Sequence, residues 1–176
     1  MNLISILHHF NLHVIRINPR PFIRMLKTEG MKNTVGVEVG VAEGENAAQM
    51  LKHLDIARLF LVDNYQQPFD KYKDKAIRLL DGKPIAWMMM DSRKAASLLE
   101  RSQMDFIYLD ADHSYESTLG DLKAYYPLLK PGGIMGGDDI TIRSVMAALL
   151  EFSRMHSIRN LTVNQREWWF KKGTMK

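Results

Sequence analysis

Acidic residues stand where the predicted strands of this chain end, and through them the chain could do chemistry. The acids that follow apolar, β-branched runs are Glu38, Asp63, Asp91, Asp110, Asp138 and Asp139. One acid in such a place commonly caps the next helix, whereas a whole row is harder to explain by capping. Because ligands bind beyond the carboxyl ends of parallel strands in an open α/β sheet, we expect these side chains to line a binding site.

Asp110, Asp138 and Asp139 carry the strongest of these signals. Asp110 begins the segment DADH at 110–113, and the two other acids end the segment GGDD at 136–139. If the two preceding strands are neighbours, their ends lie about 4.8 Å apart. Three clustered carboxylates repel one another unless one keeps its proton or a cation joins them. A hard divalent cation with oxygen ligands, most simply Mg²⁺, resolves the repulsion; a plain turn and helix cap at Asp138–Asp139 is the structural alternative.

Strand and helix patterns alternate along the chain, which is typical of a doubly wound, mostly parallel α/β sheet. The expected strands are Val35–Val39, Arg58–Asp63, Pro84–Met90, Asp105–Asp110, Gly133–Gly137, Asn160–Val163 and Glu167–Lys172, and the apolar stripes of helices fall at residues 47–54, 69–80, 93–101, 115–129 and 142–149. The last two strands are too close for a crossover helix, so we expect an antiparallel hairpin. Trp168, Trp169 and Phe170 would form its core face, and Met88–Met90 would be buried strand.

The stretch Asn33–Gln49 predicts a strand, a tight glycine turn and a helix. A site for a pyrophosphate favours the spacing G-x-G-x-x-G. Here Glu38-x-Gly40-x-x-x-Gly44 places a carboxylate at the strand end, where it would repel a pyrophosphate and attract an amino group. The turn therefore argues against a nicotinamide dehydrogenase, and a purely connecting turn is the alternative. This stretch resembles the first motif of class I S-adenosylmethionine-dependent methyltransferases, which holds the methionine half of that cofactor.

The resemblance to class I methyltransferases extends from Val35 to the C-terminus. It implies a Rossmann-like, seven-stranded sheet with strand order 3-2-1-4-5-7-6. It also implies that Asp63 binds the ribose hydroxyls and that Asp91 and Ser92 contact adenine. A helix cap, supplied by Ser92, is the alternative at that last position.

The pair of acidic segments resembles the metal-dependent O-methyltransferases, most closely the macrocin-type sugar O-methyltransferases. These have an Asp-x-x-His segment after the fourth strand and an Asp-Asp pair after the fifth. Matched residue by residue, the resemblance implies that Asp110, Asp138 and Asp139 are metal ligands and that His113 is the catalytic base. Asp110 would also face the cofactor. The implied reaction is the methylation of a sugar or other hydroxylated acceptor, with Mg²⁺ activating the hydroxyl and His113 accepting its proton.

Composition limits the remaining possibilities. The 176 residues predict a single domain, 1–176, with an N-terminal helical arm at 1–30 and a Rossmann-like core at 33–176. The absence of cysteine excludes disulfides and thiolate metal sites, and we expect a cytoplasmic location. The net charge is +4 and the sequence has no dense basic block, so we do not expect nucleic acid as a partner.

The N-terminal segment Met1–Ile17 lacks the features of a signal peptide, and no run is long enough to cross a membrane. Its histidines, His8, His9 and His13, read as partly exposed helix residues, and its apolar face could serve a homo-oligomer. Two other functions stay open: a methyltransferase that acts on RNA or protein, and a methyltransferase-fold domain without activity that binds a partner.

Overall fold

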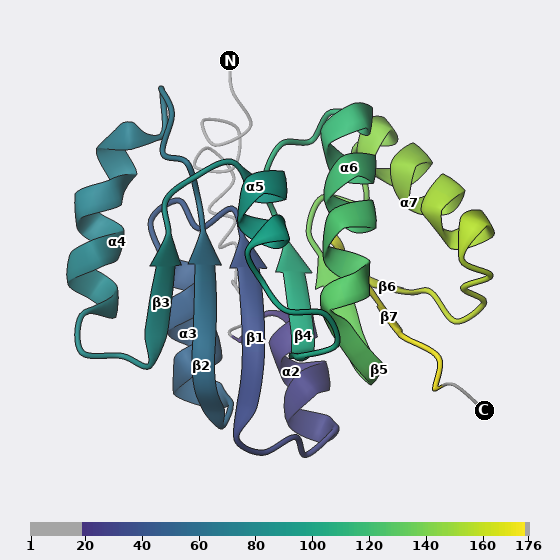
Figure 1. Ribbon diagram of the computed structural model, residues 1–176, viewed down its shortest axis with the longest axis horizontal. Coiled ribbons are helices and arrows are strands. Elements are labelled where there is room, and N and C mark those ends of the chain that lie inside the picture. The colour runs from purple at the N-terminus through teal and green to yellow at the C-terminus, as the bar shows by residue number, and fades with distance from the viewer. Residues whose placement is uncertain (1–18, 175–176) are drawn as a thin grey trace, which may run out of the picture.

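The computed structural model describes residues 19–174 and contains one seven-stranded sheet (Figure 1). Its strands, in the order β3-β2-β1-β4-β5-β7-β6, are β1 (Thr34–Val39), β2 (Ile56–Val62), β3 (Ile85–Met88), β4 (Met104–Leu109), β5 (Leu129–Gly137), β6 (Thr162–Asn164) and β7 (Glu167–Lys171). The first five strands pair in parallel, and β7 pairs antiparallel with both β5 and β6. The predicted fold class and strand order are therefore confirmed.

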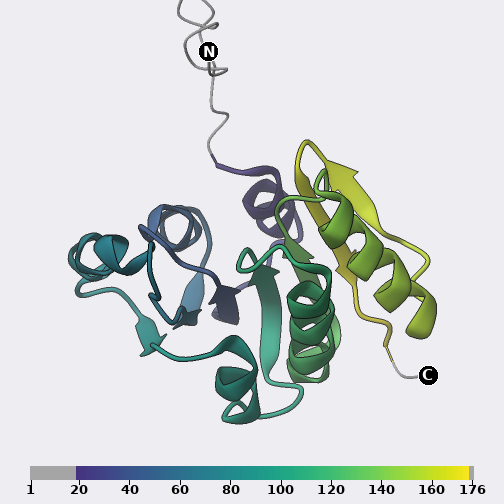
Figure 2. The same cartoon turned by 90° about the horizontal axis from the view of Figure 1, so that it is seen from above.

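Helices cover both faces of the sheet, as Figures 1 and 2 show. They are α2 (Pro21–Thr28), α3 (Glu45–His53), α4 (Lys73–Leu80), α5 (Ser92–Ser97), α6 (Tyr115–Tyr125) and α7 (Arg143–Met155), with short 3-10 turns at η1 (Asp70–Tyr72) and η2 (Tyr126–Leu128). Buried side chains of α5, α6 and α7 share one apolar cluster with the sheet, and those of α2, α3 and α4 share another. The central strands are thus buried on both faces, which explains their nearly continuous apolar sequences.

The C-terminal hairpin divides its aromatic residues between the two faces of the sheet. Trp168 and Phe170 are each 1% exposed and pack in the cluster of α5, α6 and α7, whereas Trp169 packs against the cluster of α2, α3 and α4. The expectation of one common core face was wrong, because successive side chains of a strand point to opposite faces.

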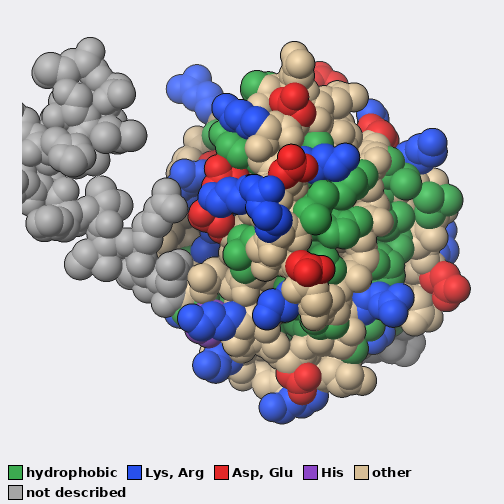
Figure 3. Space-filling view, turned by 90° about the vertical axis from the view of Figure 1, so that its left-hand side faces the viewer, with side chains coloured by type: hydrophobic (Ala, Val, Ile, Leu, Met, Phe, Trp, Pro, Cys, Tyr) green, Lys and Arg blue, Asp and Glu red, His purple; other side chains and the backbone are tan. Residues whose placement is uncertain are grey.

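Two other expectations differ from the structure near the edge strand β3. The strand ends at Met88, and Met89 is 37% exposed, so Met88–Met90 is not a fully buried strand. The apolar stripe at residues 69–80 forms η1 and α4, of which only Ala76 and Leu80 are buried. Figure 3 shows hydrophobic side chains among lysines and arginines on the side of the molecule where α4 and β3 lie.

Of the helical arm expected at 1–30, the described residues form α2, with Pro21 in its first turn, where a missing N–H costs nothing. The predictions for Met1–Ile17, including those for its histidines, lie outside the described residues. Within residues 19–174 the structure has no helix with the length and apolar character that a membrane crossing requires.

Candidate active site

A cavity of about 610 Å³ opens at the carboxyl ends of the parallel strands. Its lining includes Gly40, Asp63, Asp91, Ser92, Asp110 and His113 among the predicted site residues, together with Met90, Asp112 and Asp121. Glu38, Gly44, Asp138 and Asp139 do not line it. Most of the strand-end residues singled out from the sequence therefore meet around one cavity, as expected for an open α/β sheet.

The glycine turn after β1 packs directly on the exit of β4. Gly40 has φ +86°, and a Cβ atom there would lie 2.0 Å from the carbonyl oxygen of Asp110. Only glycine fits this combination of positive φ and close backbone approach. The turn is fixed further by Asp63, whose Oδ2 accepts the N–H groups of Val41 and Ala42 at 2.9 Å each. Asp63 thus joins the exits of β1 and β2 at the cavity wall.

Glu38 lies beneath the glycine turn. Its side chain is 1% exposed, and its Oε1 accepts a hydrogen bond from Asn46 Nδ2 at 2.9 Å. Among residues 19–174, no group donates a hydrogen bond to Oε2. Burial raises the pKa of this carboxyl to about 8, against the opposing effect of the Asn46 hydrogen bond. In this arrangement Glu38 ties β1 to α3.

At the exit of β3 the helix cap is Asp91. Its Oδ1 accepts the N–H groups of Arg93 and Lys94 at 3.0 Å each, so Asp91 and not Ser92 caps α5. The Ser92 hydroxyl instead donates to Asp121 Oδ1 on α6 at 2.6 Å. The sequence pattern could not decide this, because Asp and Ser are equally good caps in neighbouring positions.

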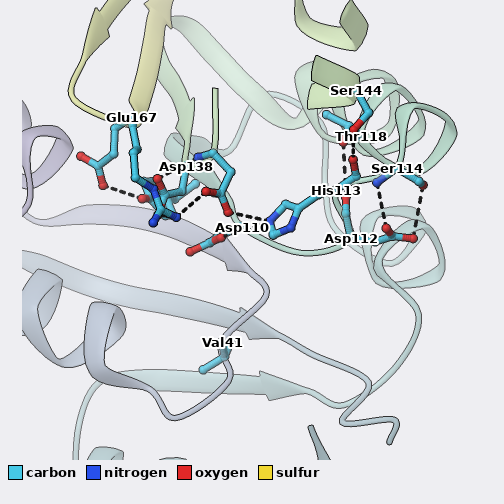
Figure 4. A network of polar contacts seen from close by, with 12 residues as sticks. Val41, Asp110, Asp112, His113, Ser114, Thr118, Asp138, Ser144 and Glu167 are labelled. Atoms are coloured by element: carbon cyan, nitrogen blue, oxygen red, sulfur yellow. Dashed lines mark hydrogen bonds and ion pairs between the residues drawn. The ribbon is translucent and has the colours of Figure 1, made fainter. Parts of the chain in front are cut away.

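Asp110, His113 and Asp139 converge where β4 and β5 end, and Figure 4 shows the His113 ring turned toward Asp110. His113 Nε2 lies 3.1 Å from Asp139 Oδ2 and 3.7 Å from Asp110 Oδ1. The nearby Asp110 carboxylate, and then the charge of Asp139, raise the pKa of His113 against the opposing effect of burial. Asp112 lies on the other side of His113 in Figure 4, where its carboxylate accepts from Ser114 N at 2.9 Å, so it does not orient the imidazole.

Two arginines pair with the same carboxylates. Arg20 Nη1 lies 3.5 Å from Asp110 Oδ2 and 3.3 Å from Asp138 Oδ2. Arg166 Nη2 lies 3.4 Å from Asp138 Oδ2 and also pairs with Asp139. Burial raises the pKa of Asp138, and the two guanidinium groups oppose that shift. Sequence reasoning missed both arginines, since no local pattern connects them to acids more than 25 residues away.

Arg20 belongs to a partly buried network that reaches β7. Its Nη1 donates to Tyr108 Oη at 2.9 Å, and the Tyr108 hydroxyl donates to Glu167 Oε1 at 2.5 Å. Glu167 Oε2 accepts the Phe22 N–H at 2.7 Å. The network therefore joins the start of α2, the carboxyl end of β4 and the start of β7, next to Asp110 and Asp138.

The donor atoms fit a small divalent cation. One ligand atom each from Asp110, His113 and Asp139 lies within 4.8 Å of the others. Carboxylates suit Mg²⁺ or Mn²⁺, whereas an imidazole is a more usual ligand of Zn²⁺ or Fe²⁺. This set differs from the predicted Asp110, Asp138 and Asp139. Asp138 Oδ1 accepts the N–H of Asp139 at 2.7 Å, and its Oδ2 faces the arginines. A cation would compete with Arg166 for Asp139.

The fold and the cavity define a Rossmann-like α/β domain with an open cavity at the strand exits, next to a glycine turn. Residues 37–140 match a family model described as a methyltransferase domain, which covers more than half of the chain. The chain therefore belongs to this family of methyltransferase domains. No curated protein sequence matches it significantly.

Solved structures with a similar fold include three methyltransferases or candidates for that activity. A Streptococcus mutans protein assigned as a candidate methyltransferase, in complex with S-adenosylhomocysteine, has a TM-score of 0.65 at 12% identity, over 90% of this chain and 99% of its own. N-methyltransferase NodS from Bradyrhizobium japonicum, also in complex with S-adenosylhomocysteine, has a TM-score of 0.56 at 18% identity. The match covers 89% of this chain and 90% of NodS. A tRNA methyltransferase from Aquifex aeolicus has a TM-score of 0.67 at 14% sequence identity, and the match covers 92% of this chain and 72% of that protein.

Proposed function

We propose that this chain is an S-adenosylmethionine-dependent methyltransferase that methylates an oxygen of a sugar or another small hydroxylated acceptor. One observation carries the proposal: a single cavity is lined both by the glycine turn at Gly40 and by Asp110 and His113. A cofactor seated on the turn and an acceptor at the carboxylates would therefore share one space. The family match and the complexes of two structural neighbours with S-adenosylhomocysteine support the cofactor.

The residues of the cavity suit the three parts of that cofactor. The bare backbone at Gly40 would approach the methionine part. Asp63 Oδ2 already accepts two N–H groups, but Oδ1 accepts only that of Tyr65 and keeps a lone pair for a ribose hydroxyl. Asp91 and Ser92 at the exit of β3 would contact the adenine. Glu38 and Gly44 would support the turn from below, since neither residue lines the cavity.

The acceptor would lie at Asp110, His113 and Asp139. Asp110 and Asp139, with Asp138 beside them, would hold a divalent cation such as Mg²⁺, which would lower the pKa of an acceptor hydroxyl bound there. His113 Nε2 would take the hydroxyl proton as the oxygen attacks the sulfonium methyl group. The C–S bond then breaks, and the products are the methyl ether, the neutral thioether and protonated His113. Asp110 and Asp139 favour that protonated imidazole.

The first experiment is calorimetric titration of S-adenosylmethionine, with NAD as the control ligand. Saturable micromolar binding of S-adenosylmethionine alone supports the proposal, and no binding refutes it. Methyl transfer to a panel of polyhydroxylated acceptors, with Mg²⁺ or with EDTA, then tests the reaction class. Transfer that is insensitive to EDTA, or that occurs only to RNA or protein, would refute the metal-dependent O-methylation.

The roles of Asp139 and His113 separate in a Mn²⁺ titration followed by electron paramagnetic resonance. Asp139→Asn should weaken Mn²⁺ binding and abolish turnover while S-adenosylhomocysteine affinity stays within a few fold. His113→Gln should lower turnover with Mn²⁺ affinity retained; if affinity falls instead, His113 is a ligand and not the base. Asp81→Asn, at the opposite edge of the sheet after α4, is the matched control and should change neither quantity.

A further inference from the structure

Asp121 on α6 is a buried carboxylate that opens on the cavity at the exit of β3. Its residue is 5% exposed and still lines the cavity together with Asp91 and Ser92. Oδ1 accepts the Ser92 hydroxyl at 2.6 Å, and no hydrogen bond from residues 19–174 reaches Oδ2. Asp121 lines the cavity and keeps one carboxylate oxygen without a protein partner, so it offers an acceptor to a ligand that brings a hydrogen-bond donor.

The other acids at this end of the cavity are already used by the protein. Asp91 caps α5 through Arg93 and Lys94, and Asp112 accepts from Ser114 N and from the Ser117 hydroxyl. Burial raises the pKa of Asp121 to about 6, so the group is still largely ionised at pH 7.5. Asp121 is therefore the acid here with both a buried environment and a free oxygen.

Ser92 is fixed so that it also presents an acceptor. Its hydroxyl hydrogen is committed to Asp121, which leaves lone pairs on Ser92 Oγ. The Tyr125 hydroxyl donates to the Ser92 carbonyl at 2.7 Å and holds the backbone of the α5 start in place. Two acceptors thus converge, one from α5 and one from α6, and Met90 and Ala111 supply apolar surface in the same cavity.

We propose that Asp121 and Ser92 select the nucleobase of the cofactor by accepting the two hydrogens of the purine 6-amino group. This inference rests on the proposed cofactor. Adenine satisfies both acceptors, whereas hypoxanthine would place a carbonyl oxygen against a carboxylate and leave Asp121 unpaired. Sites built to hydrogen-bond an NH group reject analogues that lack it. One charged hydrogen bond corresponds to about 30-fold in affinity.

The test compares S-adenosylhomocysteine with S-inosylhomocysteine by calorimetry at pH 7.5. The wild-type protein should bind the adenosine compound about 30-fold more tightly. Asp121→Asn is nearly isosteric and can turn its NH₂ group toward a carbonyl, so the preference should fall to within about threefold. Asp112→Asn removes a charge at the same end of the cavity and should keep the wild-type preference.

Each outcome separates this inference from the proposed function. If neither compound binds the wild-type protein, the cofactor assignment itself fails. If both bind with similar affinity, the function stands and the role of Asp121 is refuted, whatever the variants do. An Asp121→Asn protein that keeps the wild-type ratio would show that Asp121 only supports the fold. Ser92→Ala, which keeps the Asp91 cap, should lower the ratio in part and gives a second readout.

Discussion

Removing the Arg20 guanidinium should uncouple the three segments that meet beneath the carboxylates. Arg20→Met keeps most of the aliphatic stem and deletes the donor that faces Tyr108, Asp110 and Asp138. A charged hydrogen bond contributes about 1.5–3 kcal/mol, and breaking a buried ion pair costs about 3–5 kcal/mol. The Arg20 side chain is 38% exposed, so water screens the loss. We therefore expect a destabilisation of about 2 kcal/mol, at the lower end of these ranges.

Thermal and urea unfolding at pH 7.5 measure this loss. For a protein of this size, about 2 kcal/mol lowers Tm by about 4–8 °C. Arg24→Met is the matched control, because Arg24 lies in α2, the helix that Arg20 precedes. Within residues 19–174 its guanidinium donates a single hydrogen bond, to the carbonyl of Pro19 at 3.3 Å. This variant should change stability by less than about 0.5 kcal/mol.

The destabilisation should also depend on pH in a defined direction. Without Arg20, the pKa of Glu167, already raised by burial, rises further. The folded variant then binds more protons than the folded wild type. The difference between their free energies of unfolding therefore becomes smaller as the pH falls from 8 to 5. Two results would refute the assignment of Arg20 as the cation of this network. One is a loss of unfolding free energy no greater than that of Arg24→Met, and the other is a difference from wild type that grows as the pH falls.

Three further predictions test the glycine turn and the helix cap. Glu38→Gln should be more stable than wild type above pH 8 and similar near pH 4, since the raised pKa of about 8 makes stability fall as pH rises from the unfolded value of 4.5; urea unfolding against pH measures this. Gly40→Ala should abolish S-adenosylhomocysteine binding in calorimetry, whereas Gly82→Ala, with φ +66° and open space around it, should cost only about 1 kcal/mol and keep binding. Asp91→Ala should lose about 1 kcal/mol in urea unfolding and Asp91→Asn much less; equal losses would contradict the cap.

The sequence by itself determined the order of the elements, the class of sheet and the row of acids at the strand exits. Strand and helix periodicity are local properties, so apolar runs such as Val35–Val39 identify their elements without knowledge of the rest of the chain. The sequence also predicts that Gly40, Asp63 and Asp110 lie near one another, because the carboxyl ends of parallel strands meet at one edge of the sheet. The family resemblance supplied the order of the strands, which the structure confirms.

Only the tertiary structure decided which charges meet. Arg20 pairs with Asp138 across 118 positions, and Phe22 donates to Glu167 across 145, distances at which no sequence pattern carries information. The choice between Asp91 and Ser92 as the cap was also tertiary, because Asp121 on α6 takes the Ser92 hydroxyl. Side-chain pairing depends on which elements pack together in space. Burial then determines which of the remaining polar groups are left without a partner.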